Sequence, residues 1–177
     1  ISQEQRDPIA AVEMLRRLAF NGIEIGQLEE TVSIEGISHS KGSWVIPMDQ
    51  PNANFVRQLF SVQEYPDLRE YPEGPPEQPY DVSGWTLPYQ FDVRVVELTA
   101  PLNEEVRSKI VNLEDDPLSW DDKVDAQTWD TPPGVGFDSH PVARAVVPLE
   151  RRIAGSGPAL YLSPSENNSY RAVSRAW

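Results

Sequence analysis

The residues best suited to acid–base or metal chemistry in this sequence are its two histidines, His39 and His140. A histidine can act as a general base or bind a metal near neutral pH. Zinc enzymes need partners at fixed spacing, however, and neither histidine stands in an HxxE or HExxH pattern. Turn-forming residues flank both, so we interpret them as ordinary loop histidines. The chain has no cysteine, which excludes disulfides and thiolate metal sites.

A dense run of carboxylates lies between residues 114 and 130. Oxygen-rich sites of this kind can bind calcium, but the run lacks the alternating D-x-D-x-D-G order of a calcium loop. No carboxylate pair stands out for glycoside hydrolysis either. We therefore favour a solvated acidic surface. Its members are Glu114, Asp115, Asp116, Asp121, Asp122, Asp125 and Asp130.

The segment SPSENNS follows a predicted strand and opens a predicted helix. Open α/β sheets bind ligands at such places, and the free N–H groups of a helix start attract anions. Ser163, Ser165, Asn167, Asn168 and Ser169 could line a pocket there or act as cap and turn residues. We favour capping and keep Ser163, Asn167 and Asn168 as candidate binding residues. A hydrolase on this loop would need a base to activate a serine, and no spacing indicates one.

The stretch YPDLREYPEGPPEQPYDVSGWTLPYQ, residues 65–90, combines six prolines with four tyrosines. Such a tract could be a polyproline ligand for an aromatic groove. Its apolar side chains, however, offer more surface than proteins leave in water. We therefore predict an ordered loop that packs on the domain. Tyr80, Trp85 and Tyr89 are candidate contact residues because aromatic side chains dominate interface energetics; the alternative is a core position, which we favour for Trp85.

The net charge of -13 bears on possible partners. It disfavours nucleic acid and anionic membrane surfaces, because phosphate groups would be repelled. No apolar stretch approaches the 18 or so residues that a membrane-spanning helix needs. We expect no nucleic-acid partner and no membrane partner.

The pattern of elements predicts an α/β fold. Asp7 and Pro8 open a helix that ends at Asn21-Gly22, and a second helix covers residues 49–60. A strand is predicted over residues 94–98, a helix over 103–113, and a strand–loop–helix unit over 159–177. This alternation favours a mainly parallel sheet flanked by helices, with a hairpin or small meander inserted between residues 31 and 48 and long proline-rich loops.

A weak internal similarity joins two of these units. ISQEQRDP and IPMDQPN both run from an apolar strand end, through a glutamine, to a proline that opens a helix. Residues 1–177 are interpreted as a single α/β domain with a long acidic irregular excursion at about 114–157. Because no Met precedes Ile1 and the last predicted helix stops without a cap, we expect a fragment of a longer protein.

The block SWVIPMDQPNANFVRQLFSVQEYPDLREYPEGPPEQPYDVSGWTLPYQFDV resembles a region downstream of the catalytic domain in large bacterial zinc carboxypeptidase-like proteins of the carboxypeptidase A type. The resemblance covers residues 1–98 and 158–177. It implies an α/β fold similar to class I glutamine amidotransferases and flavodoxins. It also implies an accessory domain of an exported protein, periplasmic or extracellular, because no catalytic residue of the family carries over to a position here.

The same resemblance implies the partners and the metal. The family's zinc is held by two histidines and a glutamate of the catalytic domain, so no cofactor is expected in this chain. The catalytic domain of the same polypeptide is the expected partner, with peptide substrate as a further one. Two alternatives stay open: a stand-alone peptide- or carbohydrate-binding module, and a hydrolase that uses the loop at 163–169.

Overall fold

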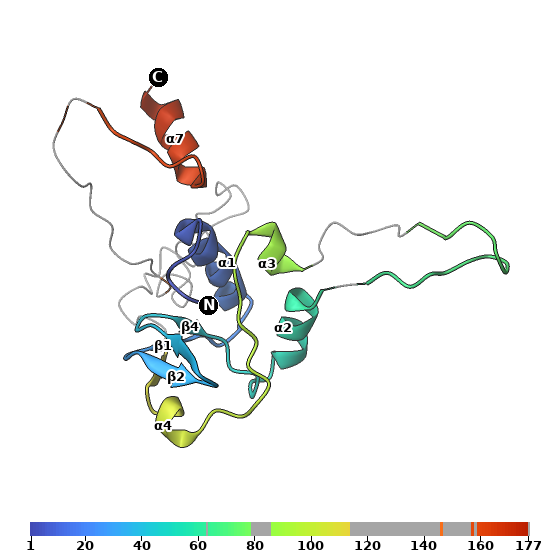
Figure 1. The fold of residues 1–177 in the computed structure, drawn as a ribbon, viewed down its shortest axis with the longest axis horizontal. Coiled ribbons are helices and arrows are strands. Elements are labelled where there is room, and N and C mark those ends of the chain that lie inside the picture. Colours follow the sequence, from blue (N-terminus) through green and yellow to red (C-terminus); the bar gives the residue numbers. More distant parts are fainter. Residues whose placement is uncertain (63, 79–85, 114–145, 147–156, 158, 177) are drawn as a thin grey trace, which may run out of the picture.

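The structure is a computed structural model that describes residues 1–62, 64–78, 86–113, 146, 157 and 159–176. Helix α1 (Pro8–Phe20) lies in the middle of the molecule, between the strands on one side and helix α7 (Asn167–Ala176) on the other (Figure 1). The remaining helices that the structure describes are α2 (Ala53–Phe60), α3 (Leu87–Gln90) and α4 (Glu104–Arg107).

The strands are short and pair antiparallel. Strand β1 (Gly26–Leu28) is the middle of a three-stranded sheet, flanked by β4 (Trp44–Val45) and β5 (Ile110–Asn112). Strands β2 (Val32–Ile34) and β3 (Ile37–His39) form a separate hairpin. Glu35 and Gly36 connect them, with φ angles of 52° and 79°. Two left-handed residues in a row are typical of a type I′ turn, whose twist suits a tight hairpin.

The prediction of a mainly parallel sheet, similar to class I glutamine amidotransferases or flavodoxins, is wrong. Every strand pair in the described part of the chain is antiparallel. A parallel pair needs a crossover of a dozen or more residues between neighbouring strands. The predicted strands at 94–98 and 159–162 are irregular, and the predicted helix at 103–113 ends at Arg107 and continues as β5. The inserted hairpin exists, but β2 and β3 form it, while β4 pairs with β1.

The predictions of helices at the start of the chain and before the proline-rich stretch are confirmed by α1 and α2. Eight of the 13 residues of α1 are buried. Leu15 and Leu18 of α1 pack in the main core with Ile25 and with Trp44 of β4. Val146, which comes from a distant part of the chain, is fully buried in the same cluster. The main core therefore lies on the strand side of α1, and a second cluster joins Ala11 and Met14 to Val93.

The similarity between ISQEQRDP and IPMDQPN has a structural counterpart. The side-chain oxygen of Gln5 accepts a hydrogen bond from the backbone N–H of Arg94 at 2.8 Å, and its amide donates to the Arg94 carbonyl at 3.1 Å. Gln50 does the same with the backbone of Glu24, at 2.8 and 3.1 Å. Both glutamines are buried. Gln5 thus satisfies the backbone N–H and C=O of Arg94, which a neighbouring strand would otherwise have paired.

Candidate functional site

The carboxylate of Asp7 connects the two ends of the described chain. Asp7 is only 4% exposed. Its Oδ1 accepts hydrogen bonds from the backbone N–H groups of Ile9 and Ala10, both at 3.1 Å, and so caps α1. Its Oδ2 accepts from the backbone N–H of Asn167 at 2.9 Å, at the start of α7 and 160 positions away in the sequence. One negative charge therefore satisfies N–H groups at two helix N-termini.

This geometry bears on the segment SPSENNS. The N–H of Asn167, which was the alternative anion site to the favoured capping role of this loop, already has the Asp7 carboxylate as its acceptor. The hydroxyl oxygens of Ser163 and Ser165 lie 2.7 Å apart, and Ser163 Oγ also accepts from the Ser165 N–H at 3.3 Å. The Asn168 side chain accepts from Arg171 at 3.3 Å. These contacts shape a turn, and a hydroxyl partner such as Ser165 does not supply the base that a serine nucleophile requires.

The structure describes one of the three aromatic candidate residues. Tyr89 lies in α3 and is 71% exposed, so its ring is available for contact. Tyr80 and Trp85 lie outside the described residues, as does the predicted acidic excursion except for Val146 and Gly157. Within the described ranges, no three histidine, aspartate or glutamate side chains gather where a metal ion could bind.

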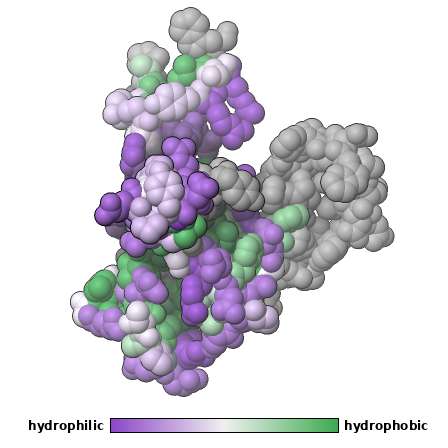
Figure 2. Space-filling view, turned by 90° about the vertical axis from the view of Figure 1, so that its right-hand side faces the viewer, coloured by the Kyte–Doolittle hydropathy of each residue, from purple (hydrophilic) through white to green (hydrophobic). Residues whose placement is uncertain are grey.

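An exposed apolar surface lies on the segment that ends in α7. We call the side chains of Leu160, Tyr161, Tyr170 and Val173 the C-terminal surface. Tyr161 is 90% exposed, Tyr170 61% and Val173 47%, and none of the ten residues of α7 is buried. Tyr170 and Val173 are three positions apart and share one side of the helix. Hydrophobic surface is visible at this end of the molecule in the space-filling view (Figure 2).

The opposite side of α7 is basic. Arg175 stands two positions after Val173 and five after Tyr170, spacings that place it away from the apolar side. Helix α7 is thus amphipathic, although the chain buries neither side of it. An amphipathic helix normally buries its apolar side against a core or a partner.

Residues 64–78, which we call the arm, project away from the rest of the molecule (Figure 1). The arm is ordered by its own contacts: the Glu77 N–H donates to the Leu68 carbonyl at 2.8 Å, and the Gly74 N–H donates to the Tyr71 carbonyl at 3.0 Å. All its residues except Gly74 are exposed. The expectation that this stretch packs on the domain is therefore wrong for the arm, because its prolines and local bonds stiffen it without any core contact.

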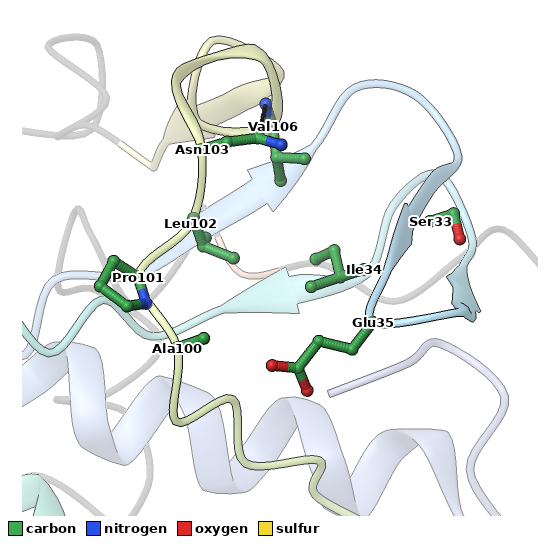
Figure 3. A pocket seen from close by; sticks show the side chains of 8 residues that line it. All are labelled: Ser33, Ile34, Glu35, Ala100, Pro101, Leu102, Asn103 and Val106. Atoms are coloured by element: carbon green, nitrogen blue, oxygen red, sulfur yellow. Dashed lines mark hydrogen bonds between the residues drawn. The ribbon is translucent and has the colours of Figure 1, made fainter.

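A small hollow of about 200 Å³ lies between the β2–β3 hairpin and the start of α4. The side chains of Ile34, Leu102 and Val106 point into it from two segments, and the Glu35 carboxylate extends from the hairpin turn toward Ala100 (Figure 3). The hollow is lined by Ser33, Ile34, Glu35, Ala100, Pro101, Leu102, Asn103 and Val106. Its base belongs to a buried cluster that includes Val106, Leu28 and Val32. The site is thus apolar with a single carboxylate.

Sequence reasoning missed the second role of Asp7 and the hollow. The signal for Asp7 as a helix cap was present, but its bond to Asn167 depends on a contact between the two ends of the chain. The hollow joins two segments more than 60 positions apart, and no local pattern marks it. The available signal was the pair Glu35-Gly36, since tight hairpin turns favour asparagine, aspartate or glycine before the second glycine, and glutamate is unusual there.

Comparison with known proteins adds no relative: no family model, no curated protein and no solved structure matches the chain. No helix in the described part of the chain is long and apolar enough to cross a bilayer.

Proposed function

We propose that this chain is a non-catalytic accessory domain that docks through its C-terminal surface onto the catalytic domain of a zinc carboxypeptidase-like protein. The zinc and its ligands belong to that catalytic domain, and both domains belong to one exported polypeptide. In this arrangement the chain supports the peptidase domain or helps to position its peptide substrate.

The observation that carries the proposal is the exposed C-terminal surface. Leaving Leu160, Tyr161, Tyr170 and Val173 in water forgoes the free energy of burying apolar area, about 25 cal/mol per Å². Two of these side chains, Tyr170 and Val173, share one side of an amphipathic helix, and exposed apolar surface on such a helix is typical of interaction sites. Tyrosine is also among the side chains that contribute most to binding energy at interfaces.

The carboxypeptidase part of the proposal rests on the sequence resemblance. It is tested by determining the sequence of the natural polypeptide that contains this chain. We expect an HxxE motif followed by a later histidine, the ligand set of the family. A polypeptide without that set contradicts the assignment of the partner.

The docking part is tested by titrating that catalytic domain with this chain in a calorimeter. We expect saturable binding that Tyr170→Ala weakens about tenfold or more, because truncating an aromatic anchor costs more than about 1.4 kcal/mol. Arg175→Gln is the matched control on the opposite side of the helix and leaves the affinity within about twofold. Equal effects of the two substitutions, or no binding, would overturn docking through this surface.

A stand-alone peptide- or carbohydrate-binding module is the second candidate, favoured by the arm. Tyr65 and Tyr71 are exposed there on a loop that holds its own shape, and exposed rigid aromatics suit ligand contact at low entropic cost. Titration of the chain with oligosaccharides and with short peptides, followed by tyrosine fluorescence, tests this idea. Binding that Tyr71→Ala abolishes supports it, and signals unchanged by that substitution count against it.

A further inference from the structure

The structure assigns a binding role to the hollow between the hairpin and α4: we propose that it takes the side chain of a lysine from a peptide or protein segment. The inference does not depend on docking through α7, because the hollow shares no residue with the C-terminal surface. It rests on the size of the hollow, on its lining, and on the position of Glu35.

The size of the hollow selects a single side chain. Its volume of about 200 Å³ lies below the range of roughly 300–1,000 Å³ that is usual for small-molecule pockets. The walls contributed by Ile34, Leu102 and Val106 are aliphatic. They suit a straight hydrocarbon stem, which side chains such as lysine bury while the charged end stays near water.

The charge at the hollow selects a cation. Glu35 is exposed, and none of the ion pairs within the described residues involves it. The first turn of α4 adds the exposed carboxylate of Glu104, whereas that of Glu105 is already paired with Lys109 at 3.4 Å. The whole chain carries a net charge of -13. A cationic ligand would therefore be attracted at long range and could form a charge-assisted hydrogen bond with Glu35.

The choice of lysine over arginine follows from the number of acceptors. A guanidinium presents five N–H donors in a planar fork and is best satisfied by several acceptors in its plane. The hollow offers one carboxylate, and the side-chain oxygen of Asn103 is already engaged by the Val106 N–H at 2.8 Å. A compact ammonium group is the better match to this single acceptor.

The backbone of Glu35 supports the assignment. Its φ of 52° lies in the left-handed region, which disfavours residues other than glycine, asparagine and aspartate. The first position of a type I′ turn is normally filled by those residues. A glutamate there is locally unfavourable, and unfavourable backbone is concentrated at functional sites. The longer side chain lets the carboxylate reach the mouth of the hollow, as seen in Figure 3.

The test uses the full chain and a capped alanine pentapeptide with lysine in the centre. Methyl resonances of Ile34, Leu102 and Val106 are followed by NMR as the peptide is added. We expect saturable shifts at these methyl groups. The same peptide with norleucine, which keeps the stem and removes the charge, binds about tenfold more weakly, and the arginine peptide also binds more weakly than the lysine peptide.

Two substitutions complete the test. Glu35→Asn removes the carboxylate and places a residue that the turn favours, so it lowers lysine-peptide affinity about tenfold while raising the melting temperature. Glu77→Gln, an exposed carboxylate on the arm, is the control and leaves the affinity unchanged. Equal binding of lysine and norleucine peptides, unchanged affinity in Glu35→Asn, tighter binding of the arginine peptide, or an absence of shifts at these three methyl groups would each overturn the assignment.

Discussion

Helices α1 and α7 start at the same carboxylate but are held in opposite ways. Asp7 accepts hydrogen bonds from the N-terminus of each helix. Helix α1 buries eight residues and contributes to two core clusters, one with strand residues and one with Val93, whereas α7 buries none. Burial of apolar area is the main favourable term in folding, so α1 is part of the cooperative core. Helix α7 is positioned by polar contacts, which leaves its apolar side for a partner.

The largest expected effect comes from removing burial in α1. Leu15 is fully buried, so Leu15→Ala should lower the free energy of unfolding by about 2–5 kcal/mol. Val173→Ala is the matched truncation in α7 and should change it by less than about 0.5 kcal/mol. Urea unfolding of both variants measures the difference. Similar losses would show that α7 is packed as firmly as α1.

The next largest effect is expected from the glutamines that bond to distant backbone groups. Gln5→Ala would leave the backbone N–H and C=O of Arg94 without their side-chain partner, at a cost of about 1–3 kcal/mol. Gln50→Ala should cost a similar amount at Glu24. The two variants should open the chain at different places, Gln5→Ala at Arg94 and Gln50→Ala at Glu24. Amide hydrogen exchange reports the place of opening. Faster exchange of the Arg94 amide in both variants would contradict separate roles for the two side chains.

Asp7 allows the two helices to be uncoupled. Asp7→Ala removes the cap of α1 and the contact to α7, and should cost about 1–2 kcal/mol. Asp7→Asn keeps an oxygen for α1 but turns an amide N–H₂ toward the N–H of Asn167. We therefore expect Asp7→Asn to cost less in global stability and still to raise amide exchange throughout α7. Retained protection of α7 in this variant would mean that other contacts hold it.

The smallest effect is expected at an exposed ion pair. Arg107 lies 2.6 Å from Asp49, and its hydrogen bond and charge lower the pKa of that carboxyl below its usual 3.8. The folded state thus keeps Asp49 ionised at a lower pH than the unfolded state does, so the contribution is present above pH 3.8 and is lost as the pH falls through the folded pKa. Both side chains are exposed, so the gain is small. Acid unfolding of Asp49→Asn should show a slightly flatter slope below pH 4, and a steeper slope would contradict this.

The local part of the fold was predictable from the sequence, and the long-range part was not. Asp7, Pro8 and Asn21-Gly22 fix the bounds of α1 through short-range capping, so the pattern sufficed. The segment around Arg94 has β-branched residues that favour a strand. The backbone N–H and C=O of Arg94, however, are taken by Gln5, 89 positions earlier. A hydrogen bond at that distance leaves no periodic mark in the sequence, and so the predicted sheet was wrong in both its strands and its direction.

The candidate site shows the same limit. The serines and asparagines of SPSENNS were recognised as cap or anion-binding residues, but the acceptor for Asn167 could only be found in three dimensions. The hollow depends on Ile34 and Leu102 meeting across two segments, which no spacing rule predicts. The exposure of Tyr170 and Val173 could not be predicted from the sequence either. An amphipathic pattern indicates that one side of a helix is buried, but it does not say whether the core or a partner covers that side.

The most direct test of the central claim is amide hydrogen exchange of the chain, alone and with the catalytic domain of its polypeptide. Exchange reports the free energy of local opening. We predict that α7 exchanges much faster than α1 in the chain alone, and that saturating catalytic domain slows α7 while α1 stays unchanged. Protection of α7 equal to that of α1 in the chain alone, or exchange of α7 that does not respond to the catalytic domain, would contradict the account.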